Sequence, residues 1–523
     1  MNKSSCLIKN LFLLSFFTVF SISSYELKSQ LPQDLDYWIM EGMMEWKIPG
    51  MAVGVVKDNE IIYLNGFGVR KLGEPERVDR NTVFGIASVS KNMTTAALAI
   101  LVDEGKLHWD DRVIDHIPWF ELSDPWVSAQ VTVRDLLLHR VGVGRMLGNR
   151  LQFMTSSERD EVIYQMRFMP FEAPFRYQAV YSNVMFSTAG QLIEYIEGVS
   201  WDEFLMERLF SPLQMNRTST RITMLEGLDN VAHPHQEIDG EVVPISWRNW
   251  DNAGPAGGVN SSVADLSNWL LMQLGDAGKF QDSSLISTAR MRDMHRPQQA
   301  LPPGDPYKAQ ASFGLGWRVS DYEGYRILSH GGATDGFNTS VYMLPEENLG
   351  IIVMSNTFNL FREAVVFTLI DAIIGNEGKD WHEYYRNLYL EGFERVKSLR
   401  EKINEEREKK TSPSFKLDQY TGIYADEAYG QIEVLLNENK ELEIKFWEDE
   451  NLITILEHWH YDTFRAIWKN PAQREEFCWF TMGKDGKPEF LKFEFALRPM
   501  LLQVGAYPSN YTRVVSFKKT SDK

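Results

Sequence analysis

The segment Phe84-Gly85-Ile86-Ala87-Ser88-Val89-Ser90-Lys91 opens an apolar stretch that runs to residue 104 and predicts a helix closed by Gly105. Ser88 and Lys91 stand three residues apart, so they share one face of that helix. A serine hydroxyl needs a base to act as a nucleophile, and a lysine in a dry pocket loses its proton more easily than in water. The helix N-terminus also favours negative charge nearby. The segment therefore predicts Ser88 as a nucleophile assisted by Lys91.

A second element is Tyr181-Ser182-Asn183, about 90 residues further along the chain. The Tyr181 phenol could carry the serine proton, and the Asn183 amide could hold a substrate carbonyl or amide nitrogen. On its own the triplet has a plainer interpretation, in which an aromatic residue precedes an asparagine that caps the next helix.

A third element is His330-Gly331-Gly332, which we expect to end a strand that begins near Tyr325. Glycines at such a place allow a substrate backbone to approach the strand closely. The backbone N–H groups of Ala333 and Ser88 could then form the two halves of an oxyanion hole. The alternative is a turn at the end of a strand with an incidental histidine.

The surrounding pattern predicts an antiparallel sheet packed by helices. Residues 33–47 carry apolar side chains at helical spacing, and the β-branched runs 51–56 and 61–66 are separated by turn residues. Strands are also expected at 325–329 and 340–354. Further helices are expected at 131–138, 186–197 and 262–274.

Taken in this order and spacing, the three elements resemble the class C β-lactamase and penicillin-binding DD-peptidase group of serine hydrolases. The similarity extends over about residues 35–375 and includes the phrases at 131–139, 254–259, 313–317 and 330–337. It implies an α+β fold, in which an antiparallel sheet is flanked by helices and a helical subdomain. It also implies an acyl-enzyme chemistry that needs no metal and no cofactor. The implied roles are catalysis by Ser88, Lys91 and Tyr181, and substrate binding by Asn183, His330 and Gly332.

The third element departs from the family pattern at two positions. His330 stands where many relatives have a lysine, and Gly331 replaces a threonine. Histidine is largely neutral at pH 7 unless its pKa is shifted, so it suits a substrate carboxylate less well. If a charged His330 contacts such a carboxylate, activity on acidic-ended peptides should fall as the pH rises through the imidazole pKa.

The change to histidine is typical of esterase-like and D-amino-acid-peptidase members of the family. Efficient β-lactam hydrolysis is therefore not expected. We expect a D-Ala-type carboxypeptidase or D-amino-acid peptidase acting on a small molecule or peptide, because an exported member of the family would meet peptidoglycan. A short-chain esterase and a true β-lactamase are the alternatives. A catalytically inactive binding or scaffold protein is the alternative from another class.

The chain divides by composition into a hydrolase domain at 31–377, a helical connector at 378–414 and a small all-β barrel at 415–520. The connector has a long helical pattern from Trp381 to Lys410, and short strand-like runs separated by turns follow it. The stretch 417–424 is similar to the lipocalin-like barrel behind this catalytic domain in many exported bacterial members. Cys478, within an apolar run of this part, is expected to be a buried and inert thiol.

The N-terminus predicts export. Lys3 and Lys9 precede the apolar run 11–22, which is shorter than the ~20 residues needed to span a bilayer. Residues 1–30 are therefore interpreted as a secretory signal peptide of a periplasmic or secreted bacterial protein, with a retained anchor as the alternative. No stable membrane span is expected after its removal. The net charge of −18 argues against nucleic acid as a partner.

Two groups of histidines were weighed as metal ligands. His458, His460 and Asp462 could lie on one face of a strand, which would suit zinc. Polar residues on an exposed strand face are usually not ligands, and His233 with His235 makes a weaker case. We expect no metal site.

Overall fold

The larger part of the chain is built on an antiparallel sheet of eight strands in the order β2-β1-β14-β13-β12-β11-β10-β9. The computed structural model describes residues 31–144, 157–238, 240–275, 279–280, 283–302, 310–376, 378–446, 452–469, 476–496 and 512–522. The sheet strands are β1 Gly50–Lys57, β2 Glu60–Gly68, β9 Gln299–Ala300, β10 Ala311–Phe313, β11 Arg318–Tyr322, β12 Tyr325–Thr334, β13 Phe337–Leu344 and β14 Leu349–Ser355.

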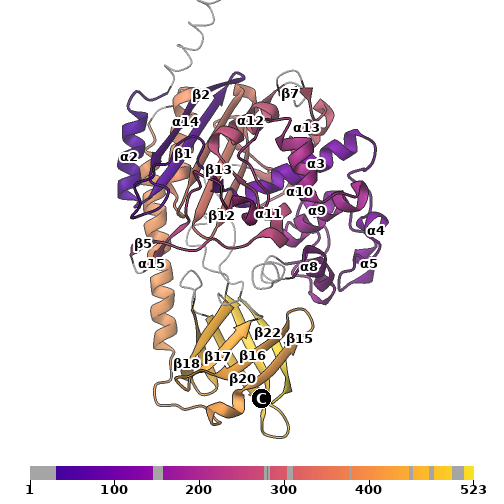
Figure 1. Ribbon diagram of the computed structural model, residues 1–523, viewed down its shortest axis with the longest axis vertical. Coiled ribbons are helices and arrows are strands. Elements are labelled where there is room, and N and C mark those ends of the chain that lie inside the picture. The colour runs from indigo at the N-terminus through magenta and orange to yellow at the C-terminus, as the bar shows by residue number, and fades with distance from the viewer. Residues whose placement is uncertain are drawn as a thin grey trace, which may run out of the picture.

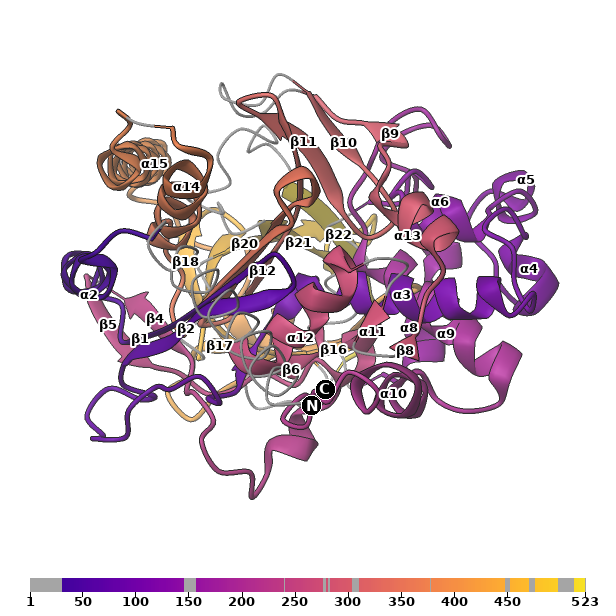
Figure 2. The same ribbon diagram turned by 90° about the horizontal axis from the view of Figure 1, so that it is seen from above.

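Helices cover both faces of this sheet, as the view from above shows (Figure 2). One face carries α2 Leu35–Glu45, α14 Phe361–Ile374 and α15 Trp381–Glu405. The other face carries α12 Val263–Leu274 and, beyond it, the helices of a second lobe. These are α3 Ser90–Asp103, α4 Val113–His116, α5 Pro125–Ser128, α6 Val133–Leu137, α8 Arg159–Gln165, α9 Asn183–Glu197, α10 Trp201–Leu205, α11 Gly254–Gly257 and α13 Thr288–His295. Because both faces are covered, every residue of β1, β13 and β14 is buried.

The C-terminal part is a closed antiparallel barrel (Figure 1). Its strands are β15 Gly422–Asp426, β16 Gly430–Leu436, β17 Leu442–Phe446, β18 Ile453–His460, β19 Thr463–Trp468, β20 Glu476–Met482, β21 Pro488–Ala496 and β22 Thr512–Ser521. Aromatic rings fill the interior, among them Tyr424, Phe446, Phe480, Phe493 and Phe517. The predicted fold class, an α+β hydrolase fold followed by a small barrel, is confirmed. Cys478 is buried in the barrel as expected, and burial raises the pKa of its thiol.

Helix α15 runs down one side of the molecule from the sheet to the barrel (Figure 1). Just beyond its end, Arg407 donates hydrogen bonds to the backbone carbonyls of His458 and Trp459 in β18, at 2.8 and 3.0 Å. The helix ends at Glu405, although its pattern predicted a helix as far as Lys410. The bounds chosen for hydrolase domain, connector and barrel stay predictions.

Two strand predictions were wrong in their limits. β12 does not stop before His330 but continues to Thr334, because Gly331 and Gly332 stay extended and pair with Ser340 and Thr339 of β13. The stretch 340–354 is two strands, β13 and β14, separated by a short 3-10 turn at Pro345–Glu347. Gly331 and Gly332, which the sequence suggested as the end of a strand, are thus kept inside the sheet by their pairing with β13.

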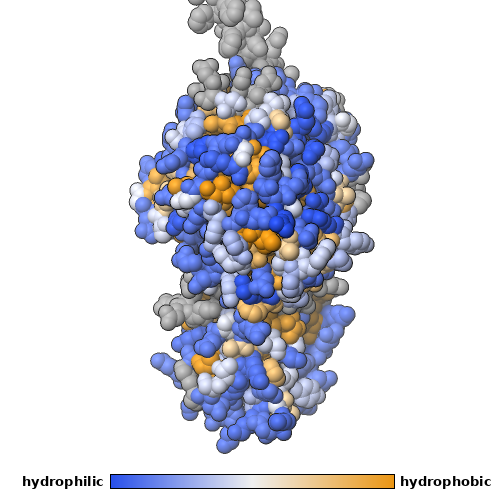
Figure 3. Space-filling view, turned by 90° about the vertical axis from the view of Figure 1, so that its right-hand side faces the viewer, coloured by the Kyte–Doolittle hydropathy of each residue, from blue (hydrophilic) through white to orange (hydrophobic). Residues whose placement is uncertain are grey.

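The visible surface is mostly hydrophilic, with apolar side chains in separate small groups (Figure 3). Within the described ranges, no helix is both long and apolar enough to cross a membrane. Residues 1–30, which carry the predicted signal peptide, lie outside the described residues, so export stays a prediction.

Buried His235 gives the fold a predicted sensitivity to acid. Its Nδ1 lies 3.1 Å from the Asn356 carbonyl oxygen, and its Nε2 accepts a hydrogen bond from the Leu72 N–H at 3.0 Å. Burial, the largest cause, lowers the pKa of His235 from 6.5 to about 4. The unfolded chain therefore binds a proton at this residue that the folded chain does not, so its stabilisation is present above about pH 6.5 and is lost as the pH falls toward 4.

We expect the free energy of unfolding, measured by urea titration, to fall by about 3 kcal/mol between pH 6.5 and 4 through this residue. A His235→Gln variant should lose that part of the pH slope. His108→Gln, at an exposed histidine, is the control and should keep the slope of the natural chain. Equal slopes in all three proteins would contradict the assignment.

Candidate active site

Ser88 lies in a short 3-10 turn, Ala87–Val89, that leads directly into α3. Ala87 has a φ of +46°, which is unfavourable for a residue with a side chain and is typical of strained functional turns. Ser90 holds this turn, since its hydroxyl donates to the Ala87 carbonyl at 2.6 Å and accepts from the Val259 N–H at 3.0 Å. The backbone in front of Ser88 is therefore fixed by its surroundings.

Lys91 is fully buried and is the second residue of α3. Its Nζ donates to the Ser88 hydroxyl at 3.1 Å and to the Ala256 carbonyl at 2.6 Å. The same nitrogen lies over the rings of Tyr181 and Phe186, 4.8 and 5.5 Å from their centroids. The predicted pairing of Ser88 with Lys91 is therefore present, although the α-helix begins at Ser90 and Ser88 lies in the 3-10 turn before it.

Tyr181 completes a cluster of three groups, because its hydroxyl donates to Ser88 Oγ at 2.9 Å. Asn183, two residues later, is the first residue of α9, while Ser182 occupies the position before the helix. The cap interpretation of Asn183 was therefore wrong by one residue. The mostly buried Asn183 side chain lies at the same helix end as Tyr181.

His139 is a residue near the site to which the sequence assigned no role. Its ring packs against the Tyr181 ring at 4.2 Å between centroids, and its Nδ1 accepts the Ser182 N–H at 3.1 Å. It therefore supports Tyr181 from behind. In the sequence, His139 was marked only as the last residue of the family-like stretch 131–139. Its partner Ser182 lies 43 residues further along the chain.

β12 passes directly beside the nucleophile turn, and Gly332 makes that approach possible. A Cβ added to Gly332 would lie 2.0 Å from the Ile86 carbonyl oxygen, whereas one added to Gly331 would have only the Thr339 oxygen nearby, at 3.9 Å. The space beside Gly331 is where relatives carry the threonine. Ala333 is the next residue of β12. That its backbone N–H and the N–H of Ser88 form an oxyanion hole stays a prediction.

His330 is buried on β12, and its Nδ1 lies 2.7 Å from the Gly316 carbonyl oxygen. A carbonyl only accepts hydrogen bonds, so Nδ1 carries the hydrogen and Nε2 keeps a lone pair. Burial, followed by the charge of Lys91, lowers the pKa of His330 from 6.5 to about 3. The expectation of a charged imidazole that titrates near neutral pH is not supported, because the surroundings of His330 disfavour a second cation.

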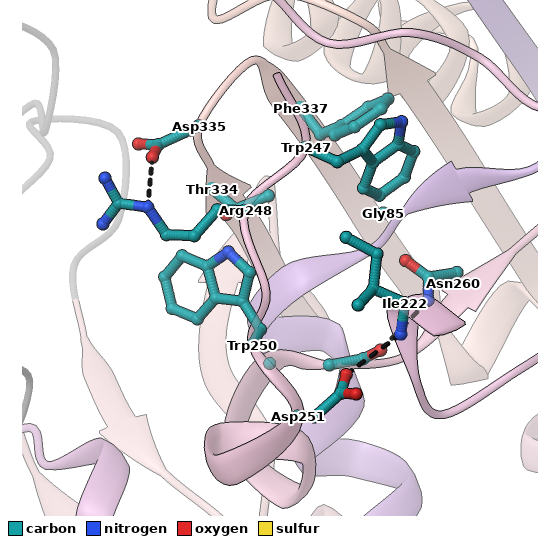
Figure 4. A pocket seen from close by; sticks show the side chains of 12 residues that line it. Gly85, Ile222, Trp247, Arg248, Trp250, Asp251, Asn260, Thr334, Asp335 and Phe337 are labelled. Atoms are coloured by element: carbon teal, nitrogen blue, oxygen red, sulfur yellow. Dashed lines mark hydrogen bonds and ion pairs between the residues drawn. The ribbon is translucent and has the colours of Figure 1, made fainter. Parts of the chain in front are cut away.

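A hollow adjoins the nucleophile turn (Figure 4). Gly85, Gly257, Gly258 and Asn260 line one part of it, and Ile222, Trp247, Trp250 and Phe337 give it apolar walls. Trp247 and Phe337 pack with their ring centroids 4.5 Å apart. Arg248 and Asp335 form an ion pair of 2.7 Å at its edge. The hollow thus combines apolar walls with the Arg248–Asp335 ion pair and a further carboxylate, Asp251, whose side chain accepts the Ile222 N–H at 2.9 Å.

Comparison with known proteins decides the family. The Beta-lactamase family profile matches residues 35–373, which is more than half of the chain. The chain belongs to the Beta-lactamase family. This β-lactamase-family hydrolase also matches DUF3471, a domain of unknown function, over residues 406–504, which include most of the barrel.

Its curated relatives include two proteins named unguisins hydrolase. UngD of Aspergillus violaceofuscus (strain CBS 115571) is 26% identical over 440 residues, and ungD' of Aspergillus campestris (strain IBT 28561) is 28% identical over 436. The matches cover 78% and 79% of this chain and 77% and 79% of those proteins. Protein flp of Staphylococcus aureus (strain MW2) is 23% identical, over 70% of this chain and 71% of its own.

Two solved structures share the fold of this β-lactamase-family hydrolase. The octameric penicillin-binding protein homologue from Pyrococcus abyssi matches with a TM-score of 0.59 and 20% identity, over 92% of this chain and 99% of that one. The crystal structure of SurE matches with a TM-score of 0.54 and 17% identity, over 90% and 98%. Both cover the barrel as well as the larger domain, so the two-part architecture recurs.

The histidines weighed as zinc ligands have other partners. Asp462 accepts hydrogen bonds from the hydroxyls of Tyr420 and Ser414, and His458 Nε2 lies 3.0 Å from the Tyr461 carbonyl oxygen. Among the residues that the structure describes, no group of three or more His, Cys, Asp or Glu side chains is arranged to hold a metal ion.

The close approach at Gly332 predicts different outcomes for two neighbouring glycines. In Gly332→Ala the new methyl group would collide with the Ile86 carbonyl, so β12 or the nucleophile turn must move. We expect a loss of about 1–3 kcal/mol in unfolding free energy and a large loss of turnover. Gly331→Ala, with open space at its Cβ, should keep the melting temperature. Similar melting temperatures for both variants, by calorimetry, would contradict this packing.

Proposed function

We propose that this chain is a serine peptidase that cleaves amide bonds through an acyl-enzyme on Ser88. The observation that carries the proposal is the convergence of Lys91 Nζ and the Tyr181 hydroxyl on Ser88 Oγ, at 3.1 and 2.9 Å. Two proton-carrying groups at one serine are what acyl transfer needs.

The reaction follows from these contacts. Ser88 Oγ attacks the substrate carbonyl carbon, and its proton passes to Lys91 or Tyr181, whichever of the two lacks its own. The carbonyl oxygen takes the negative charge opposite the N–H groups of Ser88 and Ala333. The proton then moves to the leaving nitrogen as the C–N bond breaks. Water repeats the sequence on the resulting ester, releases the acid and restores the Ser88 hydroxyl.

Of the two expected peptidase activities, the surroundings of His330 favour D-amino-acid peptidase over D-Ala-type carboxypeptidase. A neutral imidazole with its Nδ1 hydrogen directed at Gly316 offers a substrate a hydrogen-bond acceptor at Nε2, not a positive charge. Such a group suits a substrate N–H or ammonium better than a terminal carboxylate. Short-chain ester or β-lactam hydrolysis by the same serine remains the alternative activity.

Two further points support a hydrolase over an inactive scaffold. Ser88, Lys91 and Tyr181 are all present and in contact, and a buried lysine without a task would be a costly residue to retain. Relatives named for the hydrolysis of unguisins cover more than three quarters of the chain. We also propose export to the periplasm or outside the cell, on the pattern of residues 1–30.

The first test uses a penicillin as a probe of the nucleophile. The natural chain should gain the mass of the intact penicillin as an ester on Ser88, and Ser88→Ala should gain none. Intact-mass spectrometry and lactam absorbance are followed in the same samples. Adduct formation or hydrolysis of D-amino-acid amides by Ser88→Ala would rule out the proposed nucleophile.

The second test concerns the charge of His330. For two D-peptides that differ only in a free or an amidated C-terminus, the ratio of their kcat/KM values should be flat between about pH 5 and 8, since an imidazole with a pKa of about 3 stays neutral there. His330→Gln, neutral at every pH, should give the same flat ratio. A ratio that falls through pH 6–7 only in the natural chain would restore the carboxypeptidase activity to first place.

A further inference from the structure

The peptide group between Gly332 and Ala333 is held from behind by a side chain of the neighbouring strand. Asn338 of β13 is fully buried, and its Nδ2 donates to the Gly332 carbonyl oxygen at 2.9 Å. A trans peptide is planar, with its C=O and N–H pointing in opposite directions. Fixing the Gly332 oxygen toward β13 therefore directs the Ala333 N–H away from β13, on the stretch of β12 that packs against the nucleophile turn.

The Asn338 amide can adopt only one of its two orientations. Its Oδ1 accepts hydrogen bonds from the guanidinium of Arg362 and, at 3.3 Å, from the Asn359 N–H. Arginine has only donors, so the amide oxygen must face Arg362 and the amide NH₂ must face Gly332. Arg362 thus selects the orientation that lets Asn338 hold the peptide.

Arg362 is in turn fixed at the start of α14. Its Nε donates to the Ser340 hydroxyl at 2.9 Å, and its Nη2 lies 3.2 Å from the Glu363 carboxylate. The guanidinium is nearly buried, with 12% of the side chain exposed. A continuous chain of polar contacts therefore links the helix on one face of the sheet to the strand edge beside Ser88.

We propose that Asn338, oriented by Arg362, is a positioning residue that aims the Ala333 N–H into the oxyanion hole. The inference rests on the proposed acyl transfer at Ser88 and adds a pair of residues that touch neither substrate nor nucleophile. Such a role acts on the transition state, because the oxyanion forms only there, and leaves ground-state binding nearly unchanged.

The test is Asn338→Asp, which keeps size and shape but replaces the donor to Gly332 with a second oxygen. The new carboxylate can still pair with Arg362, so the fold should persist. On the ester or D-amino-acid amide that the natural chain turns over, we expect kcat to fall roughly 10- to 100-fold with KM within about threefold. The affinity for an arylboronic acid, whose adduct on Ser88 is tetrahedral, should fall with kcat.

Asn356→Asp is the matched control. Asn356 is equally buried, and its amide holds the backbone at Gly50 and Arg70 instead of β12. Asn356→Asp should have a lower melting temperature but an unchanged kcat, which separates a positioning role from general destabilisation. Arg362→Lys, which keeps the charge but not the guanidinium, is the second variant and should lower kcat in the same direction.

Three outcomes decide the inference. A fall in kcat and in boronate affinity for Asn338→Asp, but not for Asn356→Asp, supports it. A kcat within twofold of the natural chain for both Asn338→Asp and Arg362→Lys overturns it while Ser88-dependent turnover stands. Absence of Ser88-dependent turnover in the natural chain overturns the proposed function and this inference with it.

Discussion

The contact between β12 and the turn before Ser88 is the constraint on which the site depends. At Gly332 the strand backbone lies so close to the Ile86 carbonyl that no side chain fits between them. The strand is fixed on its other edge by pairing with β13, so the sheet sets where the turn must lie. The strained φ of Ala87 is tolerated because both the strand and the Ser90 hydrogen bonds hold the turn in place. These contacts fix the position of the nucleophile turn relative to β12.

The groups of the site come from separate parts of the chain. The 3-10 turn supplies Ser88, and α3, which follows it, supplies Lys91 and is packed against α9 and α11. Polar contacts fix the depth of this helix, since Thr94 donates to the Pro255 carbonyl at 2.7 Å and accepts from the Trp201 indole at 3.1 Å. Tyr181 arrives from the turn before α9. The site therefore forms where the helical lobe meets the sheet, and both must fold for it to exist.

Much of the fold and of the candidate site was predictable from local sequence patterns. The remaining features were not predictable, and the structure shows why. The pairing of Ser88 with Lys91 follows from helical spacing alone, and the antiparallel sheet and the barrel follow from alternating apolar runs. The limit of β12 was misjudged because Gly331 and Gly332 weaken a strand locally, while their pairing partners on β13 lie in another segment. His139 was marked only by its place at the end of the phrase 131–139, and no role was predicted for Asn338 or Arg362. A polar residue inside a strand or helix pattern shows its purpose only when its partner is known. Ser182, the partner of His139, lies 43 residues away, and Asn338 and Arg362 lie 24 residues apart.

The neutrality of His330 follows from the same distinction between residue type and surroundings. A histidine exposed to solvent at this position would titrate near pH 6.5 and could attract a carboxylate. Here the Gly316 carbonyl takes the Nδ1 hydrogen, burial disfavours the imidazolium, and the Lys91 ammonium opposes a second positive charge nearby. Burial and the charge of Lys91 both lower the pKa of the imidazole, whereas the hydrogen bond to Gly316 raises it and is outweighed. The imidazole of His330 is therefore a neutral hydrogen-bonding group. A lysine at this position would instead add a second ammonium group near Lys91, so the residue type at position 330 decides how much positive charge this part of β12 carries.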